Sequence, residues 1–328
     1  MKRLNTFFRL FWLLPAVAMA APFCGWAEDL GGSVLRDYPV ALTLPKGRLE
    51  IDLDYLVIRY ADDLFDAEEE NVAGPLGPGD LDGLRLTANY GLFRRMTLMS
   101  SLQYRDIEYG AGSLEVKTLD FGLKQNLVDK RDLRLPKVAL DLGLGFNWAD
   151  DQVIDAADVQ DSLSFQDASD WTASARITTG WVWGSLFPNF FAEYGYTRIE
   201  GTMAGPTVLP DAPDLPVSLT STVDRSEMYA KGGLSLLIKF PYRALLHFEY
   251  HFLRLFRDKE LEYLKYNHVF KVDFNYYFTR KLVGHIGGIY FRRQLNGEIP
   301  FLYNSFTQTS FDRDYGYMSV GLTYLFEF

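Results

Sequence analysis

Charged side chains recur at every second position in several segments, a spacing that places them on one face of an extended chain. Glu50, Asp52 and Asp54 form an acidic ladder of this kind. Nine further residues share the face that we expect to point inward: Arg85, Arg105, Lys124, Arg176, Lys231, His247, Glu249, Lys271 and Asp273. Inside a narrow enclosure such groups set the field that a solute experiences, or they pair and fill the space. Both interpretations stay open, and the acidic ladder favours a modest preference for cations.

Catalytic and metal chemistry have few candidates in this sequence. A single Cys excludes a disulfide framework and any Cys-based zinc or iron–sulfur site, and four His leave little room for a His-rich metal site. A serine nucleophile needs a hydrogen-bonded base, and no Ser or Thr lies two residues from a His on the same strand face. We therefore expect no enzyme, no catalytic residue, no bound metal and no cofactor. The net charge of −10 argues against a nucleic-acid partner.

Charge also separates two groups of connecting segments. Acidic residues crowd two long connections: Asp62, Asp63, Asp66, Glu68, Glu69 and Glu70 in the first, and Asp150, Asp151, Asp155, Asp158, Asp161, Asp167 and Asp170 in the second. Basic residues gather at the short turns: Arg94, Arg95, Lys130, Arg131, Arg134, Arg243, Arg280 and Lys281. The acidic groups are a solvated surface, sites for divalent cations that bridge to lipopolysaccharide, or a field that steers cations to a pore mouth.

The elements that position all these residues are β-strands, because the dominant hydrophobic period is two. Leu140, Leu142 and Leu144 alternate with Asp141 and Gly143, for example. About twelve segments alternate in this way: 47–60, 82–92, 94–106, 114–127, 136–149, 169–183, 188–200, 227–240, 242–255, 265–278, 281–293 and 314–328. Short turns alternate with long connections at 61–81, 107–113, 150–168, 201–226, 256–264 and 294–313.

This plan predicts an all-β fold, a transmembrane antiparallel up-and-down β-barrel of about twelve strands over residues 47–328. Aromatic residues make up 16% of the chain and recur at strand ends, where membrane interfaces favour them. A soluble sandwich or lipocalin-like barrel would point its apolar face inward. Hairpin symmetry near residue 260 predicts three opposed pairs: His247 with Asp273, Glu249 with Lys271, and Phe252 with His268. On the other side of His268, across the next turn, we expect Tyr290 or Phe291.

The first 27 residues have the features of a secretory signal peptide. Lys2, Arg3 and Arg9 precede an uncharged stretch that Pro15 and Pro22 interrupt. Cleavage is expected after Ala20 or, preferably, after Ala27, and it implies export through the inner membrane. Residues 28–46 then form an extended N-terminal lead-in or a partial plug. An autotransporter translocator would need a passenger and a pore-threading helix, and residues 28–46 supply neither.

The C-terminal strand places Tyr324, Phe326 and Phe328 on one face. It resembles the terminal strand of bacterial outer-membrane β-barrel proteins, which implies recognition by the barrel-assembly machinery and a location in the bacterial outer membrane. Residues 121–127 and 140–146 loosely resemble the outer-membrane channels grouped with the phenol meta-pathway. The resemblance implies a porin-like channel for passive passage of small solutes, in contact with outer-membrane lipid and lipopolysaccharide. An outer-membrane lipid hydrolase and a structural or adhesive barrel remain the alternatives.

Overall fold

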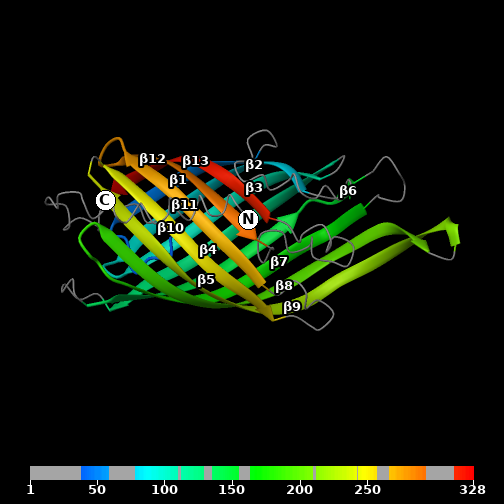
Figure 1. Cartoon of the computed structure of the whole chain (residues 1–328), viewed down its shortest axis with the longest axis horizontal. Helices are drawn as coiled ribbons and strands as arrows, with labels where there is room; N and C mark the ends of the chain where they lie inside the picture. Colours follow the sequence, from blue (N-terminus) through cyan, green and yellow to red (C-terminus); the bar gives the residue numbers. More distant parts are fainter. Residues whose placement is uncertain are drawn as a thin grey trace, which may run out of the picture.

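The computed structural model describes residues 38–58, 78–109, 112–128, 135–154, 163–209, 212–241, 243–256, 266–292 and 314–328. They form one antiparallel sheet (Figure 1), with these strands: β1 (Arg48–Ile58), β2 (Pro78–Phe93), β3 (Met96–Tyr109), β4 (Gly112–Val128), β5 (Lys137–Ala149), β6 (Gln152–Ile154), β7 (Leu163–Gly180), β8 (Leu186–Leu209), β9 (Ala212–Phe240), β10 (Ala244–Phe256), β11 (Tyr266–Tyr277), β12 (Leu282–Arg292) and β13 (Asp314–Glu327). The predicted signal peptide and the first acidic loop lie outside the described residues.

The sheet closes on itself. Strands β1 to β5 pair in sequence order, β1 also pairs with β13, and the order continues back to β7, which pairs with β5. The three-residue strand β6 pairs only with β7 within the described part of the chain and stands outside this circuit. The remaining twelve strands make a closed antiparallel barrel, which confirms the predicted fold class.

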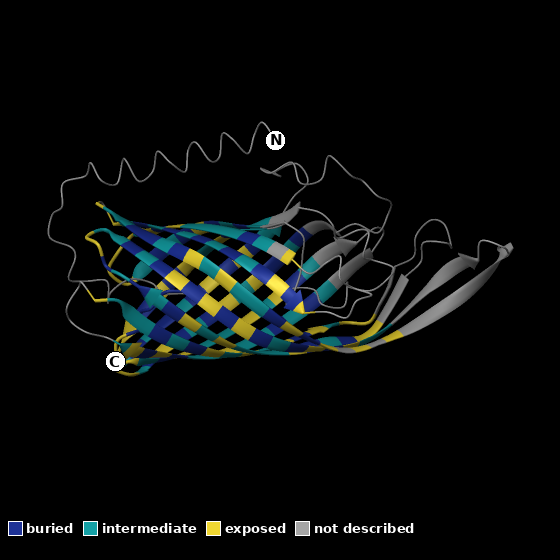
Figure 2. Cartoon of the chain, turned by 60° about the horizontal axis from the view of Figure 1, so that its bottom comes forward, coloured by how far each residue is buried: buried dark blue, intermediate teal, exposed yellow. Residues whose placement is uncertain are grey.

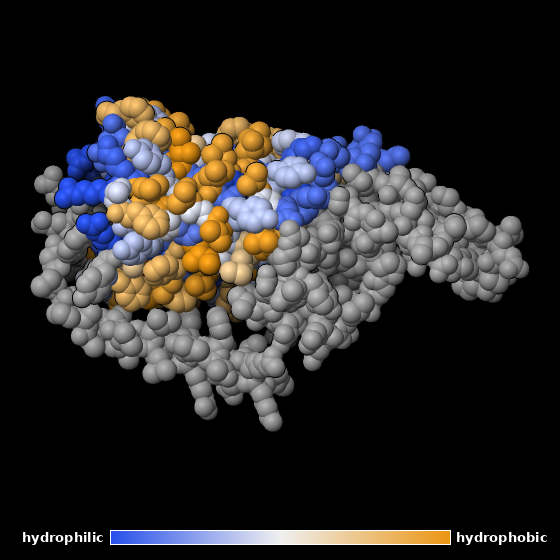
Figure 3. All heavy atoms as spheres, turned by 90° about the horizontal axis from the view of Figure 1, so that it is seen from above, coloured by the Kyte–Doolittle hydropathy of each residue, from blue (hydrophilic) through white to orange (hydrophobic). Residues whose placement is uncertain are grey.

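Alternation along each strand separates an inner from an outer face. On β5 the side chains of Leu142 and Leu144 are 46% and 49% exposed, whereas Asp141, next to Leu142 in the chain, is buried. Buried and exposed residues therefore form a chequered pattern around the barrel in Figure 2. Apolar side chains gather along the flank of the barrel, between more hydrophilic ends (Figure 3). An apolar outer face and a polar inner face are what a barrel in lipid requires.

Among the described residues, no helix is both long and apolar enough to cross a membrane.

Two connections that the sequence predicted to be long are tight. Strands β8 and β9 extend to Leu209 and from Ala212, so residues 201–226 are mostly one projecting hairpin (Figure 1). Similarly, β3 ends at Tyr109 and β4 begins at Gly112. The prediction failed because backbone hydrogen bonds continue a strand pair beyond the point where the apolar pattern stops.

The chain enters the barrel wall through a turn that reverses its direction. The Arg48 amide donates to the Pro45 carbonyl at 3.2 Å, and Gly47 adopts a φ of 78°, which glycine tolerates without strain. Gly91 faces this turn so closely that a Cβ there would lie 1.9 Å from the Pro45 oxygen. The turn directs residues 38–44 back into the barrel, where Tyr38, Val40 and Leu44 are buried.

Candidate functional site

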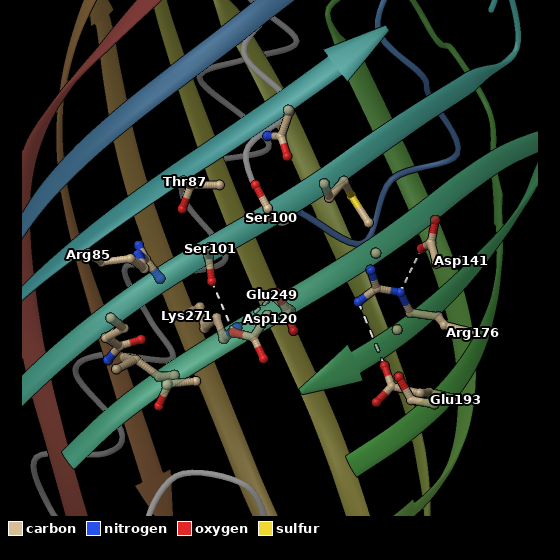
Figure 4. Close-up of a pocket in the computed structure, with 18 of the residues that line it drawn as sticks. Arg85, Thr87, Ser100, Ser101, Asp120, Asp141, Arg176, Glu193, Glu249 and Lys271 are labelled. Carbon is tan, nitrogen blue, oxygen red and sulfur yellow. Dashed lines mark hydrogen bonds and ion pairs between the residues drawn. The ribbon is translucent and has the colours of Figure 1, made fainter. Parts of the chain in front are cut away.

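The barrel encloses a cavity of about 390 Å³ with a densely charged wall. Five basic and five acidic residues line it, so the formal charges of the wall cancel: Arg85, Arg105, Arg176, Lys231 and Lys271 against Asp120, Asp141, Glu193, Glu249 and Asp273. Figure 4 shows that members of this set such as Arg85, Arg176 and Lys271 project from different strands of the barrel into the same space. Charges held at fixed positions in such an enclosure act strongly on a solute that passes between them.

Arg176 on β7 links two acidic residues of the wall. Its Nε lies 2.8 Å from Asp141 Oδ2 on β5, and its Nη1 lies 3.7 Å from Glu193 Oε2 on β8 (Figure 4). Lys231 on β9 approaches Glu193 Oε1 at 2.9 Å, and the Tyr229 hydroxyl donates to the same oxygen at 2.9 Å. Four adjacent strands are thus connected by one network, which holds its members in place.

A second network lies on β10 and β11. Glu249 Oε1 is 2.8 Å from His251 Nδ1, and Glu249 Oε2 is 3.9 Å from Lys271 Nζ. His247 Nδ1 lies 3.3 Å from Asp273 Oδ2. The strand register pairs His247 with Asp273 and Glu249 with Lys271, as hairpin symmetry predicted.

The side chains of the acidic ladder accept hydrogen bonds from neighbouring side chains and do not line the cavity. Asn89 Nδ2 donates to Glu50 at 2.8 Å, and the Thr323 hydroxyl donates to Asp52 at 2.7 Å. Arg85 donates to Asp54 Oδ2 twice, through Nε at 2.9 Å and through Nη2 at 2.7 Å. All three acidic side chains are buried, and none is part of the cavity wall. This arrangement gives no basis for the predicted cation preference, because the charges face partners and not the pathway.

His285 on β12 completes the ladder across the intervening strand β13. Its Nε2 lies 2.8 Å from Asp52 Oδ1 and its Nδ1 lies 3.4 Å from Asp54 Oδ1. The ring passes over Gly321, where a Cβ would come within 2.4 Å of His285 Cε1. Among the described residues this trio is the group that could hold a metal ion. Asp52 also accepts a hydrogen bond from the Thr323 hydroxyl, and Asp54 accepts from the Arg85 guanidinium.

The predicted lumen-lining residues therefore fall into two sets. Seven line the cavity: Arg85, Arg105, Arg176, Lys231, Glu249, Lys271 and Asp273. Five are buried away from it: Glu50, Asp52, Asp54, Lys124 and His247. The sequence analysis missed four charged or titratable wall residues: Asp120, Asp141, Glu193 and His251. Strand parity could have found them, since Asp120 shares its face with Lys124 and His251 shares its face with Glu249.

The N-terminal segment 38–44 lies inside the barrel at the end that carries the short turns. Lys124 Nζ donates to the carbonyl oxygens of Tyr38 at 3.2 Å and Val40 at 3.3 Å. The segment's apolar side chains pack against apolar residues of the wall, and the cluster comprises Tyr38, Val40, Leu42, Leu44, Val182, Phe187, Leu237 and Leu245. Tyr38, Val40, Leu42 and Leu44 alternate with less apolar residues, but this short alternation does not predict where in the barrel the segment lies.

The outer face carries many of the aromatic residues. The Tyr324 and Phe326 rings are tilted against each other with centroids 4.6 Å apart, and Phe328 beyond them is 84% exposed. Outward-facing His268 opposes Phe252, as predicted, and its Nδ1 lies 3.0 Å from the Tyr250 hydroxyl. On β12 it opposes Arg292 and not Tyr290 or Phe291, because the turn after β11 is longer than assumed.

Of the acidic residues assigned to the second long connection, two occupy different environments. Asp150 is exposed just beyond β5, and its hydrogen bonds from Lys117 Nζ at 2.9 Å hold the pKa of its carboxyl below the usual value. Asp170 instead belongs to β7 and is buried in the barrel, where Asn147 Nδ2 donates to it at 2.9 Å. The second acidic cluster is therefore divided between the barrel rim and the barrel interior.

Comparison with known proteins shows the same fold in bacterial outer-membrane barrels. No protein-family model and no curated protein matches the sequence. The outer-membrane channel COG4313 of Pseudomonas putida F1 is 11% identical, with a TM-score of 0.50 over 87% of this chain and 97% of that one. The β-domain of the Bordetella autotransporter BrkA is 12% identical, with a TM-score of 0.48 over 86% of this chain and 100% of that one. The P. putida toluene transporter TodX is 10% identical, with a TM-score of 0.42 over 87% of this chain and 91% of that one.

Proposed function

We propose that this chain is an outer-membrane channel for the passive passage of small polar solutes. The observation that carries the proposal is a closed barrel with an apolar outer face and a cavity lined by ten charged side chains. A structural or adhesive barrel would have no need of an enclosed space with so many charged groups. The fold shared with the COG4313 outer-membrane channel supports this assignment.

The wall chemistry favours polar over apolar solutes. A polar solute exchanges its hydration for the hydrogen bonds of side chains such as Lys271 and Asp120, both of which line the cavity. A hydrocarbon would separate these groups from water without replacing those bonds, which is costly for charged side chains. Because the wall has no net formal charge, we expect weak selectivity between small cations and anions.

The proposal includes a location and a set of contacts. Short turns and both chain ends belong on the periplasmic side of an outer-membrane barrel. The outward aromatic residues would meet outer-membrane lipid, and the opposite rim would meet lipopolysaccharide. The C-terminal residues Tyr324 to Phe328 would be read by the barrel-assembly machinery after export directed by residues 1–27.

A lipid hydrolase is less well supported, because each of the four His side chains contacts a group other than a Ser hydroxyl. His247, His251 and His285 face acidic residues, and His268 faces the Tyr250 hydroxyl. A Ser–His mechanism would require the imidazole to accept the nucleophile's proton directly. An assay for ester hydrolysis with the purified protein is expected to show no activity above a protein-free control.

Planar-bilayer conductance tests the channel. We expect stepwise ion conductance from the full chain or from the variant V40D/L42D, whose substitutions lie on the segment inside the barrel. Lys271→Gln, which removes a positive charge from the wall, should shift the reversal potential in a salt gradient towards cation preference. Lys281→Gln, at the exposed turn after β11, is the matched control and should shift it much less. Absence of conductance from both the full chain and V40D/L42D would overturn the proposal.

A further inference from the structure

We propose that the inner wall at the short-turn end is a binding site for an extended peptide, and that residues 38–44 occupy it as a built-in plug that closes the channel. The inference rests on the proposed channel function and adds that the channel is closed in its resting state. It is carried by the contacts of the segment, which come from six strands around the barrel.

The wall recognises the backbone of the segment. Lys124 on β4 donates to two of its carbonyl oxygens, and the Ser235 hydroxyl on β9 donates to the Pro39 carbonyl at 3.0 Å. The amide of Ala41 donates to Asn189 Oδ1 on β8 at 3.1 Å, and the amide of Leu44 donates to Thr97 Oγ1 on β3 at 2.8 Å. Donors and acceptors from opposite parts of the wall thus satisfy the peptide groups of a buried, extended segment.

Side-chain pockets fix the position of the segment. The Tyr38 ring stacks on the His247 ring of β10 with centroids 3.9 Å apart, and Asn275 Nδ2 on β11 donates to the Tyr38 hydroxyl at 3.1 Å. Val40 and Leu44 have no exposed surface in the apolar cluster. Wall residues of that cluster, such as Phe187 and Leu237, would be exposed to a water-filled lumen without the segment. The segment therefore fills the lumen between these strands at this level.

The segment can leave without damage to the barrel. Residues 38–44 are not part of the sheet, so their displacement breaks none of its strand pairs. Gly47 supplies a turn at which the segment can pivot. Lys124, which holds the segment most directly, also lies 3.9 Å from Asp141, so its charge keeps an acidic partner when the segment is absent. These features fit a removable plug better than a permanent part of the core.

Planar-bilayer conductance of the full chain tests the plug. Every variant also carries the substitution Cys24→Ser. In V40D/L42D two carboxylates would have to enter the apolar cluster, so the open population should rise at least about tenfold over wild type. Lys46→Asp, at an exposed position beside the segment, is the matched control and should conduct like wild type. Equal conductance of wild type and V40D/L42D would overturn the plug and leave the channel standing.

A synthetic peptide tests the binding site separately. The capped peptide of residues 38–44, added on the side of the C-terminus, should block V40D/L42D, and the same peptide carrying both Asp substitutions should not. Failure of the first peptide to block, or equal block by both, would contradict a specific site.

Chemical accessibility gives a measurement that does not depend on conductance. Ala41→Cys should react with a membrane-impermeant maleimide at least about tenfold more slowly in the wild-type background than in V40D/L42D, because Ala41 has no exposed surface when seated. Rapid labelling in both backgrounds would show that the segment does not occupy the site. If neither background conducts while labelling follows the expected order, the channel function fails and the peptide site stands.

Discussion

Replacement of Leu142 by Arg tests whether the barrel wall lies in lipid. Leu142 is 46% exposed on the outer face of β5. A strand residue advances about 3.3 Å, or about 2.5 Å along the membrane normal at a tilt near 40°. Leu142 lies five residues beyond Lys137, where β5 begins, and hence about 13 Å from the rim. That is about half of an apolar band roughly 25 Å tall, so Leu142 lies near the midplane.

An Arg at the midplane costs about 2–4 kcal/mol of folding free energy, against about 0–1 kcal/mol near an interface. The matched control is Leu135→Arg, since Leu135 is similarly exposed at 39% but precedes the first residue of β5. The folding equilibrium of Leu142→Arg should therefore fall by about thirtyfold to several hundredfold, and that of Leu135→Arg by severalfold at most.

Reversible folding into lipid vesicles across a urea gradient measures both variants, with the fluorescence of barrel Trp residues such as Trp148 and Trp171 as the signal. Equal losses for the two substitutions would refute the placement of this face in the membrane. A smaller loss for Leu142→Arg than for Leu135→Arg would refute the depth assignment as well.

Three further outcomes follow from the contacts described above. The double variant D52N/D54N should keep the wild-type reversal potential in a salt gradient, because both carboxylates are buried against partners; a marked loss of cation preference would show that they face the pathway. Gly321→Ala should destabilise the barrel in urea because its Cβ would meet the His285 ring. Gly288→Ala should be tolerated, because its Cβ would meet nothing closer than 3.8 Å. Equal stability of the two variants would contradict the placement of the His285 ring. Deletion of Phe328 should slow assembly in cells far more than the loss of one exposed ring implies, as gel-mobility shifts of the folded barrel would show; normal assembly would remove the proposed role of the C-terminal residues.

The sequence alone determined the architecture of the barrel. Alternation such as Leu142 and Leu144 against Asp141 identifies a strand and its two faces, because successive side chains of a strand point to opposite sides. The same rule with hairpin symmetry correctly opposed Glu249 to Lys271. It could not place the ends of β8 and β9, where pairing depends on backbone hydrogen bonds rather than on side-chain type.

Only the tertiary structure decided how the interior is used. Barrel closure brings Asp52 on β1 to His285 on β12, residues far apart in sequence whose contact depends on the empty space above Gly321. The same closure buries the acidic ladder, which the sequence predicted to affect ion selectivity, against hydrogen-bond partners.

Residues 38–44 carry only a short alternation of apolar side chains, and their position inside the barrel depends on side chains supplied by several separate strands. A local sequence pattern encodes which face of a strand is apolar. It does not encode which segment the completed enclosure will hold, because that depends on contacts that exist only after the strands have closed.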